Sequence, residues 1–221
     1  MWALFAVPFV AFLIILASYY LQWETVLKKG TLRAKAMALF PPKLSYLAFL
    51  ALSFIMGIAS FGIRYYNYSD FIGAAKLTTL VVLLAPIAYI DLKSKKIPNI
   101  LLLSGLFTRA VFYIIEFLKY NKAIADILLS DLKGLILGGG IFLIVALVAK
   151  NSIGMGDVKM FAVIGVFCGY SGTMTVIILS LFLCFAAAII MLLLRRKNMK
   201  DSLPLAPFVF IGTFLAMILG G

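Results

Sequence analysis

The chain has 221 residues, of which 65% are hydrophobic and 13% are charged, and its formal net charge is +12. Soluble domains are about 45–50% apolar and about 25% charged, so this much apolar surface indicates a protein of the lipid bilayer. The chain has no His, and its two cysteines lie in apolar runs, which excludes His-dependent catalysis, Cys-rich zinc sites and His-ligated metals.

Eight stretches of the chain approach the roughly 17–25 apolar residues that a membrane-spanning helix needs. In chain order they are 2–22, 44–63, 71–90, 98–117, 134–149, 158–169 with a loose continuation to 173, 174–194 and 203–220. The sixth stretch is short and rich in glycine. The sequence therefore predicts an all-α integral membrane protein, a polytopic bundle of about eight transmembrane helices.

Pairs of glycines at helical spacing, Gly134-x-x-x-Gly138 and Gly165-x-x-x-Gly169, are expected to let neighbouring helices pack closely.

The basic residues are concentrated in every second connection between the predicted spans. Fourteen of the twenty cations fall in alternate connections, at 28–43, 93–96, 150–159 and 195–200. The positive-inside rule then predicts that these connections are cytoplasmic and that both termini lie outside. The positive charge is thus a signal of topology and of attraction to anionic lipids, and not of nucleic-acid binding.

Most of the eight acids are expected to be solvated, because they lie in predicted connections or at their edges. These are Glu24, Asp70, Glu116, Asp126, Asp131 and Asp201, the segment 119–133 being interpreted as a mixed-charge outer loop. Asp91 closes the third span and Asp157 opens the sixth, so the topology brings both to the same edge of the membrane. Either one alone has an ordinary explanation, as a solvated helix end or as an N-cap. Together they suggest function, since acids at that depth are costly.

Two neighbouring carboxyl groups do not both ionise easily, so one holds a proton while the other does not. Such a pair can activate water and protonate a leaving amine without His or metal. Gly154 and Gly156 would let an extended substrate approach the backbone. The helix ends on which they lie favour Asp91 as the protonated partner and Asp157 as the base. The chemistry indicated is aspartic peptide hydrolysis at the membrane surface.

Three ordered motifs resemble those of type IV prepilin peptidases and archaeal preflagellin peptidases, which are GxGD membrane aspartic proteases. DLKSKKIPN, from Asp91 to Asn99, resembles their Asp-x(5)-Ile-Pro-Asn motif. GMGDVK, at 154–159, resembles Gly-x-Gly-Asp-x-Lys, and LPLAPF, at 203–208, is similar to the Pro-x-x-Pro-Phe opening of their last helix. The resemblance divides the chain into an N-terminal membrane region, 1–83, and a peptidase core, 84–221.

The resemblance implies cleavage of short basic leader peptides from type IV prepilin-like or preflagellin-like precursors at the cytoplasmic face of the cell membrane. It implies that Asp91 and Asp157 are the catalytic pair. Six further residues match motif positions and have supporting roles: Lys93, Pro98, Asn99, Gly154, Gly156 and Lys159. We expect Pro98 to fix the chain where it enters the fourth span, and Lys93 and Lys159 to reach lipid phosphates or tune the pair. The expected partners are these precursors and membrane lipids, and no cofactor is expected.

Many bacterial members of this family carry two Cys-x-x-Cys pairs in the loop after the first helix, where they are associated with N-methylation. Here the predicted cytoplasmic loop 23–43 contains no Cys, which leaves methyltransferase activity in doubt. Two non-enzymatic alternatives stay open: a proton-coupled carrier and a pilus-assembly membrane scaffold. A carrier would place its acids near the middle of the bilayer, in broken helices of two corresponding halves, whereas Asp91 and Asp157 lie at one edge.

Overall fold

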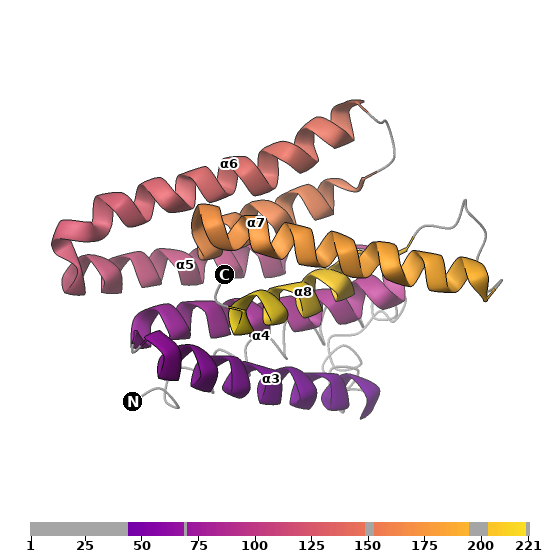
Figure 1. Ribbon diagram of the computed structural model, residues 1–221, viewed down its shortest axis with the longest axis horizontal. Coiled ribbons are helices and arrows are strands. Elements are labelled where there is room, and N and C mark those ends of the chain that lie inside the picture. Colours follow the sequence, from indigo (N-terminus) through magenta and orange to yellow (C-terminus); the bar gives the residue numbers. More distant parts are fainter. Residues whose placement is uncertain (1–43, 69, 149–152, 195–202, 220–221) are drawn as a thin grey trace, which may run out of the picture.

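The computed structural model describes residues 44–68, 70–148, 153–194 and 203–219 of the chain. The expected first span, 2–22, and the Cys-free loop, 23–43, lie outside the described residues. The helices, labelled as in Figure 1, are α3 (Leu44–Tyr68), α4 (Phe71–Ser94), α5 (Asn99–Lys119), the short 3-10 turn η1 (Asn121–Ala123), α6 (Ile124–Val148), α7 (Met155–Leu193) and α8 (Ala206–Ile218).

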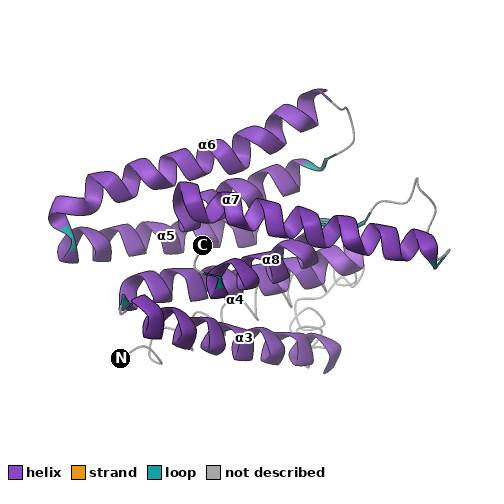
Figure 2. Ribbon diagram, in the orientation of Figure 1, coloured by secondary structure: helices purple, strands orange, loops and turns teal. Residues whose placement is uncertain are grey.

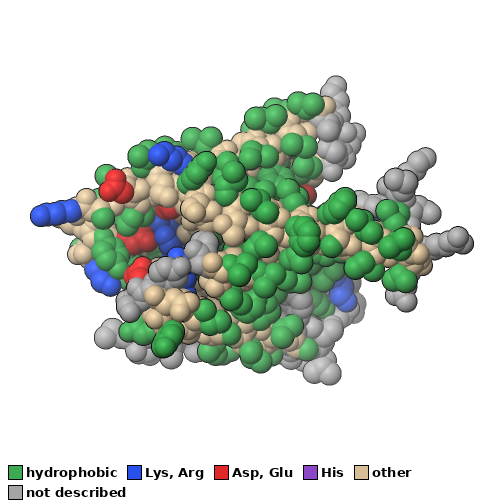
Figure 3. All heavy atoms as spheres, viewed as in Figure 1, with side chains coloured by type: hydrophobic (Ala, Val, Ile, Leu, Met, Phe, Trp, Pro, Cys, Tyr) green, Lys and Arg blue, Asp and Glu red, His purple; other side chains and the backbone are tan. Residues whose placement is uncertain are grey.

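The regular secondary structure of the described residues is entirely helical, and Figure 2 shows helices and no strand among them. Four helices are long and apolar enough to cross a membrane, namely α4, α5, α7 and α6 together with η1, and α8 is a shorter apolar helix. Figure 3 shows hydrophobic side chains over most of the visible face, with charged side chains gathered mainly at one end. The expectation of an all-α membrane protein is confirmed.

Helix α4 forms the centre of the bundle. Every residue from Leu80 to Asp91 is buried, and Figure 1 shows α4 with α3 on one side and α8 on the other. A helix that is apolar all round is suited to this position, because it can pack against neighbours in every direction. The helix begins at Asp70, whose carboxylate accepts the N–H groups of Ile72 and Gly73 at 3.2 and 3.1 Å.

The expectation of an outer loop at 119–133 is wrong. The chain forms η1 and then continues directly into α6, which starts ten residues before the expected fifth span. Asp126 is exposed, as expected, but Asp131 faces the bundle and is only 3% exposed. A count of apolar residues starts the fifth span only after the charged residues of 119–133. Helix α6 includes several of these residues, and one of them, Asp131, has a buried partner.

That partner belongs to a buried ion-pair cluster made of Arg109, Glu116, Asp131, Lys76 and Tyr113. Arg109 is 1% exposed; its guanidinium donates to Glu116 Oε2 at 2.8 Å and to Asp131 Oδ2. Tyr113 also donates to Asp131, at 2.9 Å, and Lys76 lies 3.4 Å from Glu116. The prediction that Glu116 and Asp131 are solvated is therefore wrong. Both are buried and paired, which offsets the cost of removing their charges from water.

Helix α7 covers both the expected sixth and seventh spans, and its backbone breaks at Gly169, where φ is 66° and ψ is −170°. Figure 1 shows the chain reversing direction at this point, so that the two parts of α7 run antiparallel. Contacts agree: a Cβ added to Gly138 of α6 would meet both Phe161 and Thr173, which lie twelve residues apart in sequence. The division falls at the end of the stretch predicted as 158–169, and the loose continuation to 173 belongs to the second part of α7. Glycine adopts this backbone conformation without strain.

The paired glycines pack helix against helix, as expected. A Cβ on Gly134 of α6 would collide with the carbonyl oxygen of Gly165 in α7, and one on Gly138 would collide with that of Phe161. Close approach of the two backbones therefore depends on the missing side chains.

Candidate active site

Asp91 lies one turn before the end of α4 and is 5% exposed. The helix ends at Lys95, whose backbone is left-handed with φ of 52° and whose N–H bonds to the Asp91 carbonyl at 2.8 Å. The Asp91 carboxylate does not point into solvent as a free helix-end acid would. Its Oδ2 accepts the backbone N–H of Ala206 at 3.0 Å, from a residue 115 positions later in the chain.

Asp157 lies in the first turn of α7, which begins after Gly154. Its side chain is half-buried, and the Asp91 carboxyl is the charged group that acts on it most strongly among the described residues. A Cβ on Gly154 would lie 3.2 Å from Asp157 Oδ2, so the glycine leaves room for this carboxyl to fold back over the start of its own helix. The structure thus places the carboxyl groups of Asp91 and Asp157 close enough to interact electrostatically.

The segment between α4 and α5 packs against the start of α7. Pro98 is buried, and its carbonyl accepts the N–H of Leu101 at 3.2 Å as α5 begins. A Cβ on Gly156 would lie 3.0 Å from Cβ of Ile97, so a side chain at this position would push the two segments apart. The Ile-Pro-Asn and Gly-x-Gly-Asp segments are therefore direct neighbours.

A polar contact joins the same two segments. Lys159 of α7 donates from Nζ to Oδ1 of Asn99, the first residue of α5, at 3.1 Å. Lys93 behaves differently, because its ammonium lies 5.4 Å from the centre of the Tyr89 ring on its own helix. Its ring contact therefore stays within α4, whereas the contact of Lys159 joins two motifs.

A family model described as the type IV leader peptidase family matches residues 78–221, about two thirds of the chain. The chain belongs to the type IV leader peptidase family. No curated protein and no solved structure gives a significant match. The matched region contains all three motifs, and it runs from within α4 to the end of the chain.

Several groups near the leader peptidase motifs were not singled out in the sequence. Lys95 is exposed, yet its charge acts on Asp91. Cys184, in the second part of α7, lies close enough to Asp157 for the Asp157 charge to act on its thiol. Ala206 contributes only its backbone, so no side-chain pattern signals it beyond its place within the Pro-x-x-Pro-Phe motif. In the part of the chain that the structure describes, no three Asp, Glu or Cys side chains could together hold a metal ion.

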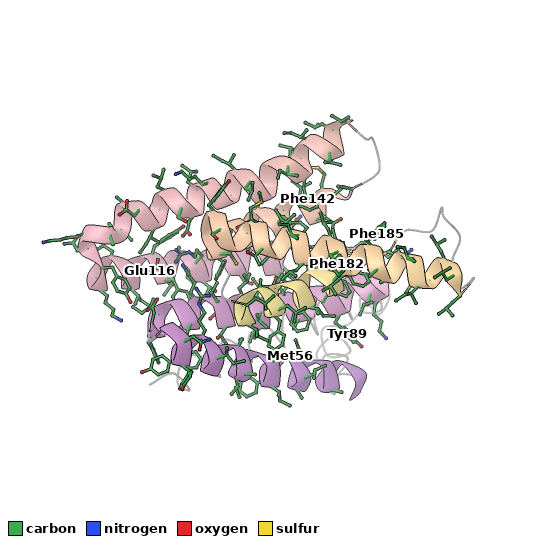
Figure 4. The ribbon with its side chains drawn as sticks, in the orientation of Figure 1. Met56, Tyr89, Glu116, Phe142, Phe182 and Phe185 are labelled. Atoms are coloured by element: carbon green, nitrogen blue, oxygen red, sulfur yellow. The ribbon has the colours of Figure 1, made fainter. Side chains whose placement is uncertain are left out.

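The two ends of the leader peptidase bundle differ in chemistry. The end of α4 and the starts of α5, α7 and α8 meet at one end, whereas the buried ion-pair cluster lies toward the other. Figure 4 shows Tyr89 near the first of these ends and Glu116 near the second. At the aspartate end, one carboxyl is held by a backbone donor and the other is half-exposed, an arrangement that can meet water and an extended peptide together.

Proposed function

We propose that this leader peptidase family member is a membrane-embedded aspartic endopeptidase in which Asp91 and Asp157 form the acid–base pair. The observation that carries the proposal is the convergence of three motifs at one end of the bundle. The Asp91 charge acts on Asp157, Gly156 packs against Ile97, and the Ala206 backbone N–H donates to the Asp91 carboxylate. Segments far apart in sequence meet around the two acids that close the third predicted span and open the sixth.

The pair supports water-mediated hydrolysis. The ionised carboxylate accepts a proton from water as the water oxygen bonds to the scissile carbonyl carbon, and the protonated carboxyl gives its proton to the carbonyl oxygen. On collapse, the C–N bond breaks and the first carboxyl passes its new proton to the amine. A hydroxyl proton of the diol returns to the second carboxyl, so both groups recover their starting states.

The proposed substrates are type IV prepilin-like or preflagellin-like precursors, cut after a short basic leader at the cytoplasmic face of the cell membrane. The family supports this substrate class, and the distribution of cations supports the membrane face. In this proposal residues 84–221 form the peptidase core and residues 1–83 an N-terminal membrane region. The proposed topology has about eight membrane spans and places both termini outside.

The test is incubation of the purified protein with a prepilin, with the products resolved by mass. Asp91→Asn and Asp157→Asn should each abolish cleavage, because Asn keeps the shape of Asp but neither ionises nor carries the transferable proton. The double variant should be scarcely worse than either single variant, since the two groups act as a unit. Asp126→Asn, which changes an exposed acid of α6, is the matched control and should cleave normally. Wild-type turnover in either single variant would refute the two-aspartate mechanism and reopen the carrier and scaffold alternatives.

A further inference from the structure

The N-terminus of α8 meets a carboxylate of the proposed catalytic pair. A helix begins with N–H groups that have no partner within the helix. In α8 the N–H groups of Phe208 and Val209 both bond to the Leu205 carbonyl, at 3.0 and 3.1 Å, and Pro207 has no N–H. Ala206 therefore supplies the remaining first-turn donor, and the structure directs it to Asp91 Oδ2.

Burial disfavours the ionised form of Asp91, which is only 5% exposed, and three features around it oppose that effect. A backbone donor stabilises a carboxylate more than a neutral carboxyl group, and the bond from Ala206 is 3.0 Å long. The Leu205 backbone also faces this carboxyl, and the positive end of the α8 dipole lies at the same point. Lys95 adds a full positive charge from the end of α4.

Asp157 has a different set of neighbours. The backbone of Gly154 and the start of α7 stabilise a negative charge on Asp157, and the thiol of Cys184 lies nearby. The charged group that acts on it, within the described residues, is the Asp91 carboxyl, which disfavours a second negative charge. Stabilisation of negative charge on Asp91 therefore also keeps the proton on Asp157.

We infer that the N-terminus of α8 holds Asp91 as the ionised base of the pair and that Asp157 carries the proton. This inference rests on the proposed function and assigns the two roles within it. Asp91 takes the proton from the attacking water and later gives it to the amine, while Asp157 protonates the carbonyl oxygen and recovers a diol proton. Ala206 is a positioning residue that acts through Asp91.

The assignment is the reverse of the one expected from the sequence. That expectation considered only the helix on which each aspartate lies, and the end of α4 does oppose negative charge on Asp91. The start of α8, which comes from another part of the chain, opposes that effect with a direct hydrogen bond to the carboxylate.

The two assignments predict different changes in the pH dependence of kcat/KM, whose limbs report the essential base and acid of the free enzyme. Ala206→Pro removes the N–H that reaches Asp91. Proline is common at the first position of a helix, and here it also requires Leu205, whose backbone is helical, to adjust. We expect the low-pH limb to move to higher pH by about one unit, the size expected for loss of a hydrogen bond to a charged group. The high-pH limb should stay in place. Ala206→Gly keeps the N–H, so it measures how far the loss of the Ala206 side chain alone moves either limb.

A second pair of variants tests the same inference without altering α8. Lys95→Asn removes the charge that acts on Asp91, and Asn tolerates the left-handed backbone found there. The low-pH limb should again move to higher pH, by less than in Ala206→Pro. Lys96→Asn removes a neighbouring charge that is also exposed and should move neither limb. Limb positions are measured on the active fraction alone, so a reduced amount of folded protein does not imitate these changes.

Movement of the high-pH limb, with the low-pH limb fixed, would overturn the inference and assign the proton to Asp91. Limbs that stay in place in both Ala206→Pro and Lys95→Asn would also overturn it. If Ala206→Pro is inactive, the Lys95→Asn profile decides. A wild-type protein that cleaves no prepilin would refute the proposed function itself, an outcome distinct from cleavage with the wrong limb displaced.

Discussion

Arg109 is predicted to be the residue on which the end of the bundle opposite the aspartates depends most. Its guanidinium contacts Glu116 of its own helix, Asp131 of α6 and, through Nε at 3.0 Å, the carbonyl oxygen of Val166 in α7. It also stacks on the Tyr113 ring, with 3.8 Å to the ring centre. Val166 lies shortly before the break at Gly169, where helical carbonyls lose their usual partners, so Arg109 closes the first part of α7.

Arg109→Met keeps an unbranched side chain but leaves two buried carboxylates without their shared cation. Asp131 retains the Tyr113 hydroxyl, and Glu116 retains Lys76 at 3.4 Å. Removing one partner of a buried ion pair costs about 3–5 kcal/mol, because the charge that remains is uncompensated. Here one substitution uncovers two charges, so we expect a loss of stability in the upper part of that range.

The assay is thermal unfolding in detergent, followed with a dye that reacts with the thiols of Cys168 and Cys184 as they become accessible. The comparison that isolates the charge effect is the triple variant Arg109→Met, Glu116→Gln, Asp131→Asn. It removes all three charges and should be more stable than Arg109→Met alone, despite carrying two more substitutions. A single variant as stable as wild type, or a triple variant less stable than the single one, would show that the guanidinium does not neutralise these carboxylates.

The remaining predictions concern the reversal in α7, the topology and the product. Gly169→Ala should lower stability by about 1–3 kcal/mol in the same assay, since φ of 66° with ψ of −170° is a region that almost only glycine adopts; Gly140→Ala, where a Cβ meets nothing closer than 3.9 Å, is the control, and equal effects of the two would contradict the reasoning. In a variant without the two native cysteines, a Cys at Asn121 should react with an impermeant thiol reagent in intact cells and a Cys at Asn198 should not; the opposite labelling would invert the topology. The mature product formed with S-adenosylmethionine present should keep an unmethylated N-terminus, and a product heavier by one methyl group would show that the Cys-rich loop is dispensable.

Much of the fold follows from properties that are local in sequence. The apolar content and the long apolar runs require a bilayer, and a bilayer requires helices whose backbone groups bond internally. The glycine pairs at 134–138 and 165–169 also signal close helix packing by their spacing alone. Asp91 and Asp157 could be singled out because topology places them at one edge, and their catalytic role stays a prediction.

Charges and helix ends were decided by tertiary structure. Glu116 and Asp131 have the sequence context of solvated loop acids. Arg109 lies on the same helix as Glu116, but it reaches Asp131 of α6 across the fold, and all three side chains are buried. The neighbourhood of Asp91 likewise depends on Ala206, which approaches from another helix with a backbone group that side-chain patterns do not record. The physical reason is the same in both cases. The length of an apolar run determines whether a segment enters the membrane. The state of a charge is set by the donors, acceptors and ions within a few ångströms, and for Asp91 and Asp131 these include groups from other helices.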